Sequence, residues 1–235
     1  SRVTVDIDFL LKSLPNTPEQ LRAILERIIS VDTGNEFITF EITSVLPISV
    51  AKKYAGISAS LVAHIKNTRT PFSIDFGVGD VIVPKQEKRK IPTQLNDFSS
   101  PMINTYSLET TIAEKIDAIL SLMEFSSRMK DYYDIYYLAN KFDFDGKILV
   151  DALKRTFANR EHNFTVEQFE QVMSFDADDL MQRKWKAFIK KIDAKTDDFS
   201  KVINTIDDFL RFPIETALNG TNFLMQWKAS SNIWE

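Results

Sequence analysis

The chain has 235 residues, of which 44% are hydrophobic and 26% are charged, and its formal net charge is −4 at pH 7. This balance is typical of a folded globular protein and excludes a disordered chain, while the negative net charge gives no general attraction to nucleic acids. The absence of cysteine excludes disulfides, a thiolate nucleophile and a cysteine-based zinc site.

The sequence contains no apolar run of transmembrane length, and its first residues lack the basic and apolar segments of a signal peptide. We therefore expect a soluble, cytoplasmic protein with no membrane partner. The two histidines, His64 and His162, lie at no metal-ligand spacing from another histidine or a carboxylate. We interpret both as structural or surface residues.

The first predicted element is a strand with the sequence VTVDIDFL, in which apolar and polar residues alternate. Asp6 and Asp8 are two residues apart, so they share the face opposite the apolar one. Two carboxylates held this close repel each other unless a cation lies between them, and Mg²⁺ prefers such oxygen ligands. The alternative interpretation is an acidic, solvated strand face.

A helix is predicted over residues 17–30, because Thr17 suits its N-cap, Pro18 suits its first turn, and the following apolar residues share one face. Three segments with strand character follow, at residues 36–43, 58–66 and 71–76. Residues 84–104 are predicted to form a loop that carries the basic run KQEKRK at residues 85–90.

A third acid lies in the strand-like segment PFSIDF, where Asp75 alternates with Ile74 and Phe76. If this segment pairs with the first strand, Asp75 joins Asp6 and Asp8 in one acidic cluster, and such a cluster is typical of metal-dependent phosphoryl chemistry. We call these three residues the strand acids. The alternative is that Asp75 ends a strand and caps a turn.

From residue 108 onward the pattern is helical almost to the end, and the change near residue 105 predicts two parts. Residues 1–104 are expected to form a mixed sheet with flanking helices, and residues 105–235 an α-helical domain, which together give an α+β fold. A second basic run, QRKWKAFIKK, occupies residues 182–191. The predicted helices cover residues 108–125, 128–141, 145–160, 165–173, 179–192 and 199–211.

The helix at residues 108–125 places Lys115 in the middle of its apolar face, whereas Glu114 and Asp117 are predicted to point away. A buried ammonium group must be paired. Lys115 is therefore expected to form salt bridges with structural carboxylates or to hold a phosphate. A third possibility is that its head reaches solvent while its stem is buried.

The next helix is predicted to start near Arg128, with Ser127 as its N-cap, and to place Asp131 and Asp134 on one face. Arg128 and Lys130 add positive charge at a helix start, where an anion binds readily. The alternative interpretation is that Asp131 only complements the helix dipole and that Asp134 is exposed.

These features combine into one hypothesis for the site. The strand acids would bind Mg²⁺, and Lys115 with Arg128 and Lys130 would hold the triphosphate of an NTP. Asp131 or Asp134 would orient Lys115 or a substrate group. Phosphoryl and nucleotidyl transfer need this equipment, because both depend on positioning and on neutralising charge.

Three segments together resemble the AbiEii/AbiGii-type toxin nucleotidyltransferases of type IV toxin–antitoxin and phage abortive-infection systems. The resemblance extends from Arg2 to about Arg160, and loosely to the end of the chain. DxD alone is a weak motif, but the spacing of the E-K-x-x-A and R-x-K-D-x-x-D patterns is specific. The three segments are RVTVDIDFL, PFSIDFGVGDVIVP and SLETTIAEKIDAILSLMEFSSRMKDYYDIYYLANKFDFDG.

The resemblance implies a polymerase-β-type nucleotidyltransferase core followed by a helical bundle. It matches the strand acids to the family's metal-binding acids, Lys115 to its nucleotide-contacting lysine, and Asp131 and Asp134 to the acids of its last motif. The implied activity is Mg²⁺-dependent transfer of a nucleotide from an NTP to RNA, with tRNA as the expected acceptor, or to another macromolecule. An antitoxin encoded nearby is the implied protein partner.

The family also carries a Gly-Gly or Gly-Ser motif on a helix just before the DxD strand. The given sequence begins at Ser1, after that position, so the core is expected to lack its N-terminal helix. The motif separates the enzyme from an alternative, a degenerate and catalytically inactive nucleotidyltransferase-like interaction module. The basic runs at residues 85–90 and 182–191 would contact RNA phosphates in the enzyme, or form solvated faces.

Overall fold

The computed structural model of the chain describes residues 6–11, 17–34, 37–48, 56–79, 81–93, 97–125, 128–193 and 196–235. Its backbone contacts divide into two compact units. The sheet unit spans Val3–Asp80, and the helical unit begins at Val81 and continues to Glu235. Each unit has its own cluster of buried hydrophobic residues.

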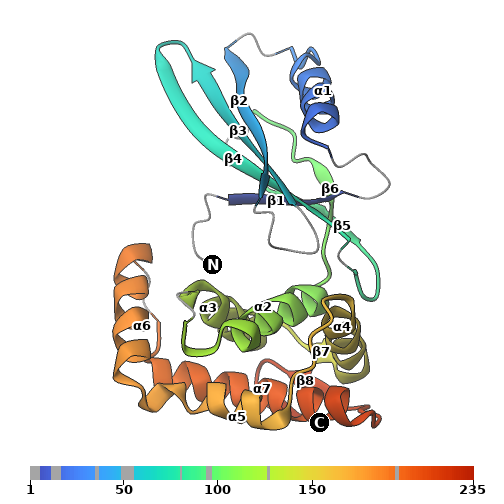
Figure 1. Cartoon of the computed structure of the whole chain (residues 1–235), viewed down its shortest axis with the longest axis vertical. Helices are drawn as coiled ribbons and strands as arrows, with labels where there is room; N and C mark the ends of the chain where they lie inside the picture. Colours follow the sequence, from blue (N-terminus) through green and yellow to red (C-terminus); the bar gives the residue numbers. More distant parts are fainter. Residues whose placement is uncertain are drawn as a thin grey trace. The chain divides into compact units, whose positions relative to one another are not determined.

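The sheet unit contains a mixed four-stranded sheet with the strand order β1-β4-β3-β2 (Figure 1). β1 is parallel to β4, and the other neighbouring strands are antiparallel. The three strand-like segments predicted after the first helix correspond to β2, β3 and β4. The elements of the unit are β1 (Asp6–Leu11), α1 (Pro18–Ile29), β2 (Ile38–Ile48), β3 (Gly56–Ile65) and β4 (Thr68–Val78).

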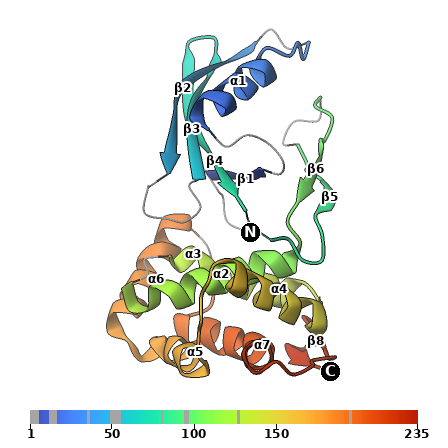
Figure 2. The same cartoon turned by 45° about the vertical axis from the view of Figure 1, so that its right-hand side comes forward.

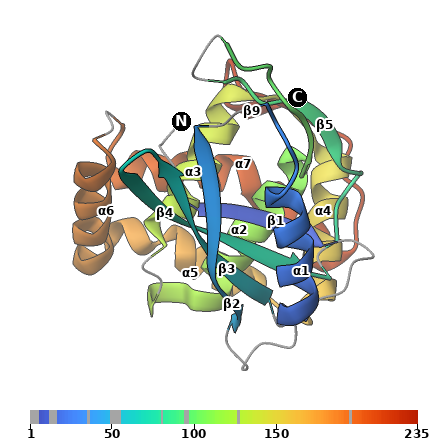
Figure 3. The same ribbon diagram turned by 90° about the horizontal axis from the view of Figure 1, so that it is seen from above.

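α1 lies against the sheet next to β2 (Figure 3). Its predicted N-cap is confirmed, because the Thr17 hydroxyl accepts a hydrogen bond from the backbone N–H of Gln20. Leu21 and Leu25 pack in one core with the sheet residues Ile57 and Phe76, so α1 covers the apolar face of the sheet. The core of the unit consists of Leu11, Leu21, Leu25, Val45, Ile57, Ala59, Leu61 and Phe76.

The helical unit is built from two layers of helices (Figure 2). α7 packs against α3, α4 and α5, while α2 packs against α3, α4 and α5. The apolar stripes of these helices meet in one large core. The helices are α2 (Leu108–Leu122), η1 (Met123–Phe125), α3 (Met129–Lys141), α4 (Gly146–Asn159), α5 (Val166–Met173), η2 (Phe175–Ala177), α6 (Asp179–Ile192) and α7 (Phe199–Asn219).

The prediction of a loop over residues 84–104 is wrong in part. β5 (Glu87–Lys90) and β6 (Met102–Thr105) form an antiparallel hairpin within it. The hairpin buries little of its surface, so its sequence lacks the alternation of apolar and polar residues on which strand prediction depends. It begins the helical unit.

The last predicted helix, at residues 199–211, is too short, because α7 continues through Pro213. Proline lacks the N–H that would bond the carbonyl four residues earlier. In this helix the indole N–H of Trp234 donates to that carbonyl, on Phe209, at 3.0 Å. Trp234 belongs to a small sheet of β7 (Phe144–Asp145), β8 (Gln226–Lys228) and β9 (Ile233–Trp234), so the C-terminal segment stabilises the helix across its proline.

The predicted α+β fold is confirmed: a mixed four-stranded sheet with a helix is followed by a predominantly helical region. The predicted domain boundary at residue 104 stays a prediction. Within the ranges that the structure describes, no helix combines the length and the apolar character needed to cross a membrane.

Candidate active site

Two of the strand acids are direct neighbours in the sheet. The parallel register of β1 and β4 pairs Asp8 with Asp75, so both occupy the same face. Asp8 is exposed and Asp75 is half-buried. Neighbouring strands lie about 4.8 Å apart, which brings two like charges close together. The condition on which the acidic cluster depends, the pairing of these two strands, is therefore met.

Asp6 lies two residues before Asp8 on the same face of β1, and the register pairs it with Ser73. Its backbone therefore belongs to the row beside the Asp8–Asp75 pair, while its side chain lies outside the described part of the chain. The opposite face of the same strands is apolar, since Phe9 stacks on Phe76 with ring centroids 5.8 Å apart. The alternation in the sequence thus separates the acids from the hydrophobic face.

Sequence analysis missed a residue beside Asp75. The hydroxyl of Ser58 on β3 donates a hydrogen bond to Oδ1 of Asp75 at 2.6 Å, and the register of β3 and β4 pairs the two residues directly. Ser58, Asp75 and Asp8 therefore form one row across three strands. The only signal in the sequence is the position of Ser58 on the polar face of an alternating strand.

The environment of Asp8 and Asp75 suits a divalent cation, because Mg²⁺ prefers hard oxygen ligands and usually binds through one or two carboxylates. Among the described residues, no three His, Cys, Asp or Glu side chains form a group that could hold a metal ion. The predicted third ligand, Asp6, has no described side chain. Metal binding by the strand acids stays a prediction.

In the helical unit, Lys115 is paired with two carboxylates from α3. Its Nζ lies 3.2 Å from Oδ1 of Asp131 and 2.7 Å from Oδ2 of Asp134. The side chain of Lys115 is only 18% exposed, and that of Asp131 is fully buried. The predicted pairing of Lys115 with carboxylates is confirmed, and the i, i+3 spacing of the two aspartates places both within reach of its ammonium group. Phosphate binding by Lys115 stays a prediction.

Arg128 adds a second cation to this network. It is the N-cap residue of α3, and its Nε donates to Oδ2 of Asp131, whose other oxygen accepts from Lys115. The predicted N-cap, Ser127, lies outside the described residues. Burial raises the pKa of the neighbouring Tyr132 hydroxyl above its ordinary value, and the charge of Asp131 raises it further. Asp131 is therefore neutralised by cations, and the phenol stays protonated.

The prediction that Asp117 points away from the core of α2 is wrong. Its side chain is 2% exposed, and its carboxylate lies 2.8 Å from Nη1 of Arg160 and 2.8 Å from Nδ1 of His162. A carboxylate is tolerated at this depth only with charged or hydrogen-bonding partners. Both partners follow α4, more than forty residues later in the chain, so the pattern of α2 alone could not reveal them.

The strand acids belong to the sheet unit, and Lys115, Arg128, Lys130, Asp131 and Asp134 belong to the helical unit. Each set is positioned within its own unit by the contacts described above. The prediction that both sets serve one catalytic site stays a prediction.

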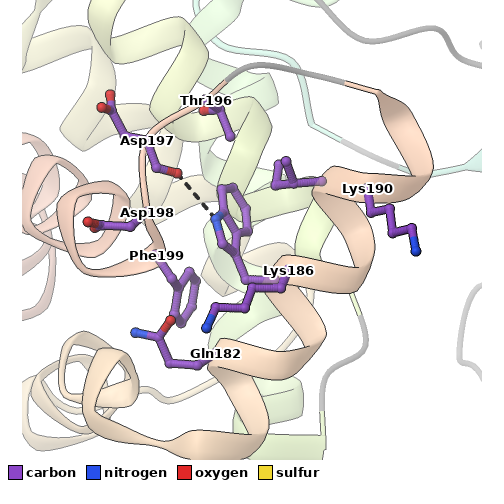
Figure 4. A pocket seen from close by; sticks show the side chains of 9 residues that line it. Gln182, Lys186, Lys190, Thr196, Asp197, Asp198 and Phe199 are labelled. Carbon is purple, nitrogen blue, oxygen red and sulfur yellow. Dashed lines mark hydrogen bonds between the residues drawn. The ribbon is translucent and has the colours of Figure 1, made fainter.

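A pocket of about 420 Å³ lies between α6 and the start of α7 in the helical unit. Figure 4 shows Gln182 and Lys186 of α6 on one side and Asp198 and Phe199 on the other. The Trp185 indole donates to the carbonyl of Asp197 at 3.3 Å. None of the site residues predicted from the sequence lines this pocket, so we assign it no part in catalysis.

The two predicted basic runs differ in structure. In the run at residues 85–90, Arg89 on β5 forms an ion pair with Glu87 at 2.6 Å. This ion pair reduces the net positive charge of the run. In the second, α6 exposes a stripe of basic side chains along its outer face, which we call the α6 stripe. It consists of Arg183, Lys186, Lys190 and Lys191.

Comparison with known proteins gives one family and two related structures. The family described as nucleotidyl transferase AbiEii toxin, type IV TA system, matches residues 1–211. The crystal structure of JHP933 from Helicobacter pylori is 11% identical, with a TM-score of 0.47, over 93% of this chain and 77% of that chain. A second H. pylori crystal structure, described as a candidate nucleotidyltransferase, has 11% identity and a TM-score of 0.47, with 93% and 80% covered. No curated protein sequence matches significantly.

Proposed function

This chain belongs to the family of AbiEii nucleotidyl transferase toxins of type IV toxin–antitoxin systems, and from that premise we propose that it transfers a nucleotide from an NTP to an RNA acceptor in a Mg²⁺-dependent reaction. The observation that carries the proposal is the pairing of Asp8 with Asp75 on one polar sheet face. Two acids are placed side by side there at an electrostatic cost, which a bound cation would remove.

The strand acids would hold the cation. When bound, Mg²⁺ neutralises triphosphate charge and makes the α-phosphorus more electrophilic. The residues of the chain would contribute positioning, because Asp8 and Asp75 are neighbours in the ladder of β1 and β4. Asp6, one row further along β1, is the proposed third ligand.

In the transfer itself, an acceptor hydroxyl oxygen would form a bond to the α-phosphorus of the NTP. The bond from that phosphorus to the oxygen that bridges the α- and β-phosphates would break, pyrophosphate would leave with that oxygen, and the hydroxyl proton would pass to water. Lys115 would bind the triphosphate, supported by Arg128 and Lys130. Asp131 and Asp134 would orient Lys115, a role supported by the two ion pairs that they form with its ammonium group.

The acceptor is proposed to be RNA, with tRNA as the first candidate. The α6 stripe supports this choice, because exposed basic side chains at helical spacing attract a phosphate backbone. A cognate antitoxin is the protein partner that membership in a toxin family implies.

The direct test is incubation of the chain with each labelled NTP, Mg²⁺ and total tRNA. We expect label from at least one NTP to enter the RNA, and we expect chelation of Mg²⁺ to prevent it. The same assay compares Asp8→Asn, which should lose label incorporation, with Asp151→Asn, which changes an exposed aspartate of α4 and should keep it. If no NTP labels RNA or protein while the chain still binds a cognate antitoxin, the inactive interaction module is the correct function.

A further inference from the structure

We propose that Ser58 is a positioning residue, whose hydroxyl fixes the carboxylate of Asp75 in the orientation that binds the divalent cation. The inference rests on the proposed function, in which Asp75 is a metal ligand. It adds a residue on β3 to a proposed metal site whose ligands lie on β1 and β4.

The first support is the geometry of the contact. Ser58 and Asp75 are direct partners in the antiparallel ladder of β3 and β4, so their side chains leave the same face at neighbouring positions. The hydroxyl donates to Oδ1 at 2.6 Å, which is a normal distance for a hydrogen bond from a hydroxyl to a carboxylate. Both residues are half-buried, so water competes less for the bond than at an exposed site.

The second support is the arrangement of the row. Asp75 occupies the strand between β1 and β3, with Asp8 on one side and Ser58 on the other. Repulsion from Asp8 would turn the Asp75 carboxylate away from the place where both acids could share a cation. A hydroxyl that donates to one oxygen opposes this rotation. The bond uses one acceptor position of the carboxylate and leaves Oδ2 and a further position on Oδ1 for a cation.

The third support comes from the neighbouring row. Ser60 lies two residues further along β3, on the same face, but its partner on β4 is Ser73 instead of an acid. A general preference for small polar residues on this face would explain both serines. It would not explain why the serine opposite the acid donates its hydroxyl to the carboxylate. Ser60 therefore provides a matched control.

The experiment compares Ser58→Ala, Ser58→Thr and Ser60→Ala with the wild-type chain. The first readout is the Mg²⁺ concentration that gives half-maximal NTP-dependent transfer. The second is binding of Mn²⁺ to the protein without NTP, followed by electron paramagnetic resonance. The third is the thermal melting temperature in chelator, which monitors the fold.

Residues that orient a metal ligand typically change metal affinity by about 10- to 100-fold. We therefore expect Ser58→Ala to raise the half-maximal Mg²⁺ concentration and to weaken Mn²⁺ binding by about tenfold or more, with a melting temperature close to that of wild type. Ser58→Thr should restore both values, because it keeps the hydroxyl. Ser60→Ala should match the wild type in all three measurements.

Two results would overturn the positioning role: unchanged metal dependence in Ser58→Ala, or an equal loss in Ser60→Ala. Failure of the proposed function has a different signature, namely that the wild-type chain transfers no nucleotide. In that case the Mn²⁺ measurement still decides, because weaker binding by Ser58→Ala alone supports the role of Ser58. Equal Mn²⁺ binding by the wild type and Ser58→Ala, or no Mn²⁺ binding by either protein, contradicts the positioning role of Ser58.

Discussion

Aspartates of the two units occupy opposite environments. In the sheet unit, Asp8 is exposed and faces another acid across the β1–β4 pair. In the helical unit, Asp117 is buried and lies against Arg160 and His162, which follow α4. In the first environment two acids are neighbours, whereas in the second the carboxylate is paired with basic side chains of its own unit.

Under the proposed function, this difference separates acids that would bind a cation from an acid that is paired within the fold. A buried carboxylate needs charged or hydrogen-bonding partners within the fold, because burial of an unpaired charge has a large unfavourable free energy. A pair of acids near solvent has no such requirement and can remain available for Mg²⁺. The same replacement, Asp→Asn, should therefore have opposite effects on activity and stability in the two units.

The largest expected effect is on catalysis. Asp8→Asn and Asp75→Asn should each reduce NTP-dependent transfer by at least about 100-fold, since the loss of one ligand removes several kcal/mol of transition-state stabilisation. The thermal melting temperature in chelator should equal or exceed that of wild type, because repulsion between the acids is relieved.

Transfer rates per folded molecule and melting curves check this prediction. If either variant melts far below wild type and keeps its transfer rate, that aspartate is structural. The contrast between the two units would then fail.

The second effect is on stability, in the helical unit. Asp117→Asn should lower the free energy of unfolding by about 2 kcal/mol, because the buried carboxylate loses its charge-assisted bonds to Arg160 and His162, while Arg160 keeps its 3.8 Å contact with Glu114. Urea denaturation followed by circular dichroism measures the change. Asp151→Asn, at an exposed position of α4, is the matched control and should stay within about 0.5 kcal/mol of wild type. Equal losses in both variants would show that Asp117 contributes no more than a surface residue.

A smaller effect concerns the acceptor. Replacing Lys186 and Lys190 of the α6 stripe by glutamine should weaken tRNA binding, and the salt dependence of log K should become shallower by about two. Titrations at several salt concentrations measure this slope. Replacing Lys147 and Arg155 of α4 by glutamine removes the same charge from other exposed positions of the helical unit and should leave the slope unchanged. An identical change in both double variants would mean that the α6 stripe has no special role.

The smallest effect is a pH dependence at the start of α7. A hydrogen bond from the Tyr136 hydroxyl, followed by the interaction with Lys201, lowers the pKa of Asp197. A depressed folded-state pKa stabilises the protein above the ordinary aspartate pKa of about 3.9, and this contribution is lost as the pH falls through the folded-state pKa.

The difference in unfolding free energy between wild type and Asp197→Asn should therefore be largest near neutral pH. It should shrink as the pH falls below about 4. Denaturation curves across this range provide the measurement. A difference that grows toward acid would show that the pKa of Asp197 is not lowered in the folded protein.

Much of the fold was determined by local pattern. The alternation around Asp6 and Asp8 predicted β1, and the apolar periodicity of the second half predicted α2 to α6 with ends close to those observed, together with the start of α7. The pairing of Lys115 with Asp131 and Asp134 was also accessible, because helical spacing places both aspartates on one face and a lysine in an apolar stripe requires a partner. The hairpin of β5 and β6 was not predicted, because exposed strands lack the alternation of apolar and polar residues. The continuation of α7 through Pro213 was not predicted either, because the hydrogen bond that compensates for the proline comes from Trp234, which is distant in the sequence.

By itself, the sequence determined which residues carry charge on which face of each element, because side-chain direction repeats with the backbone period. Only the tertiary structure decided which faces meet. It paired Asp8 with Asp75, placed Ser58 beside Asp75, and enclosed Asp117 with Arg160 and His162. These contacts join residues far apart in the chain, and they form because burial of each unit's hydrophobic core selects one strand order and one helix packing. The polar partners follow from that selection.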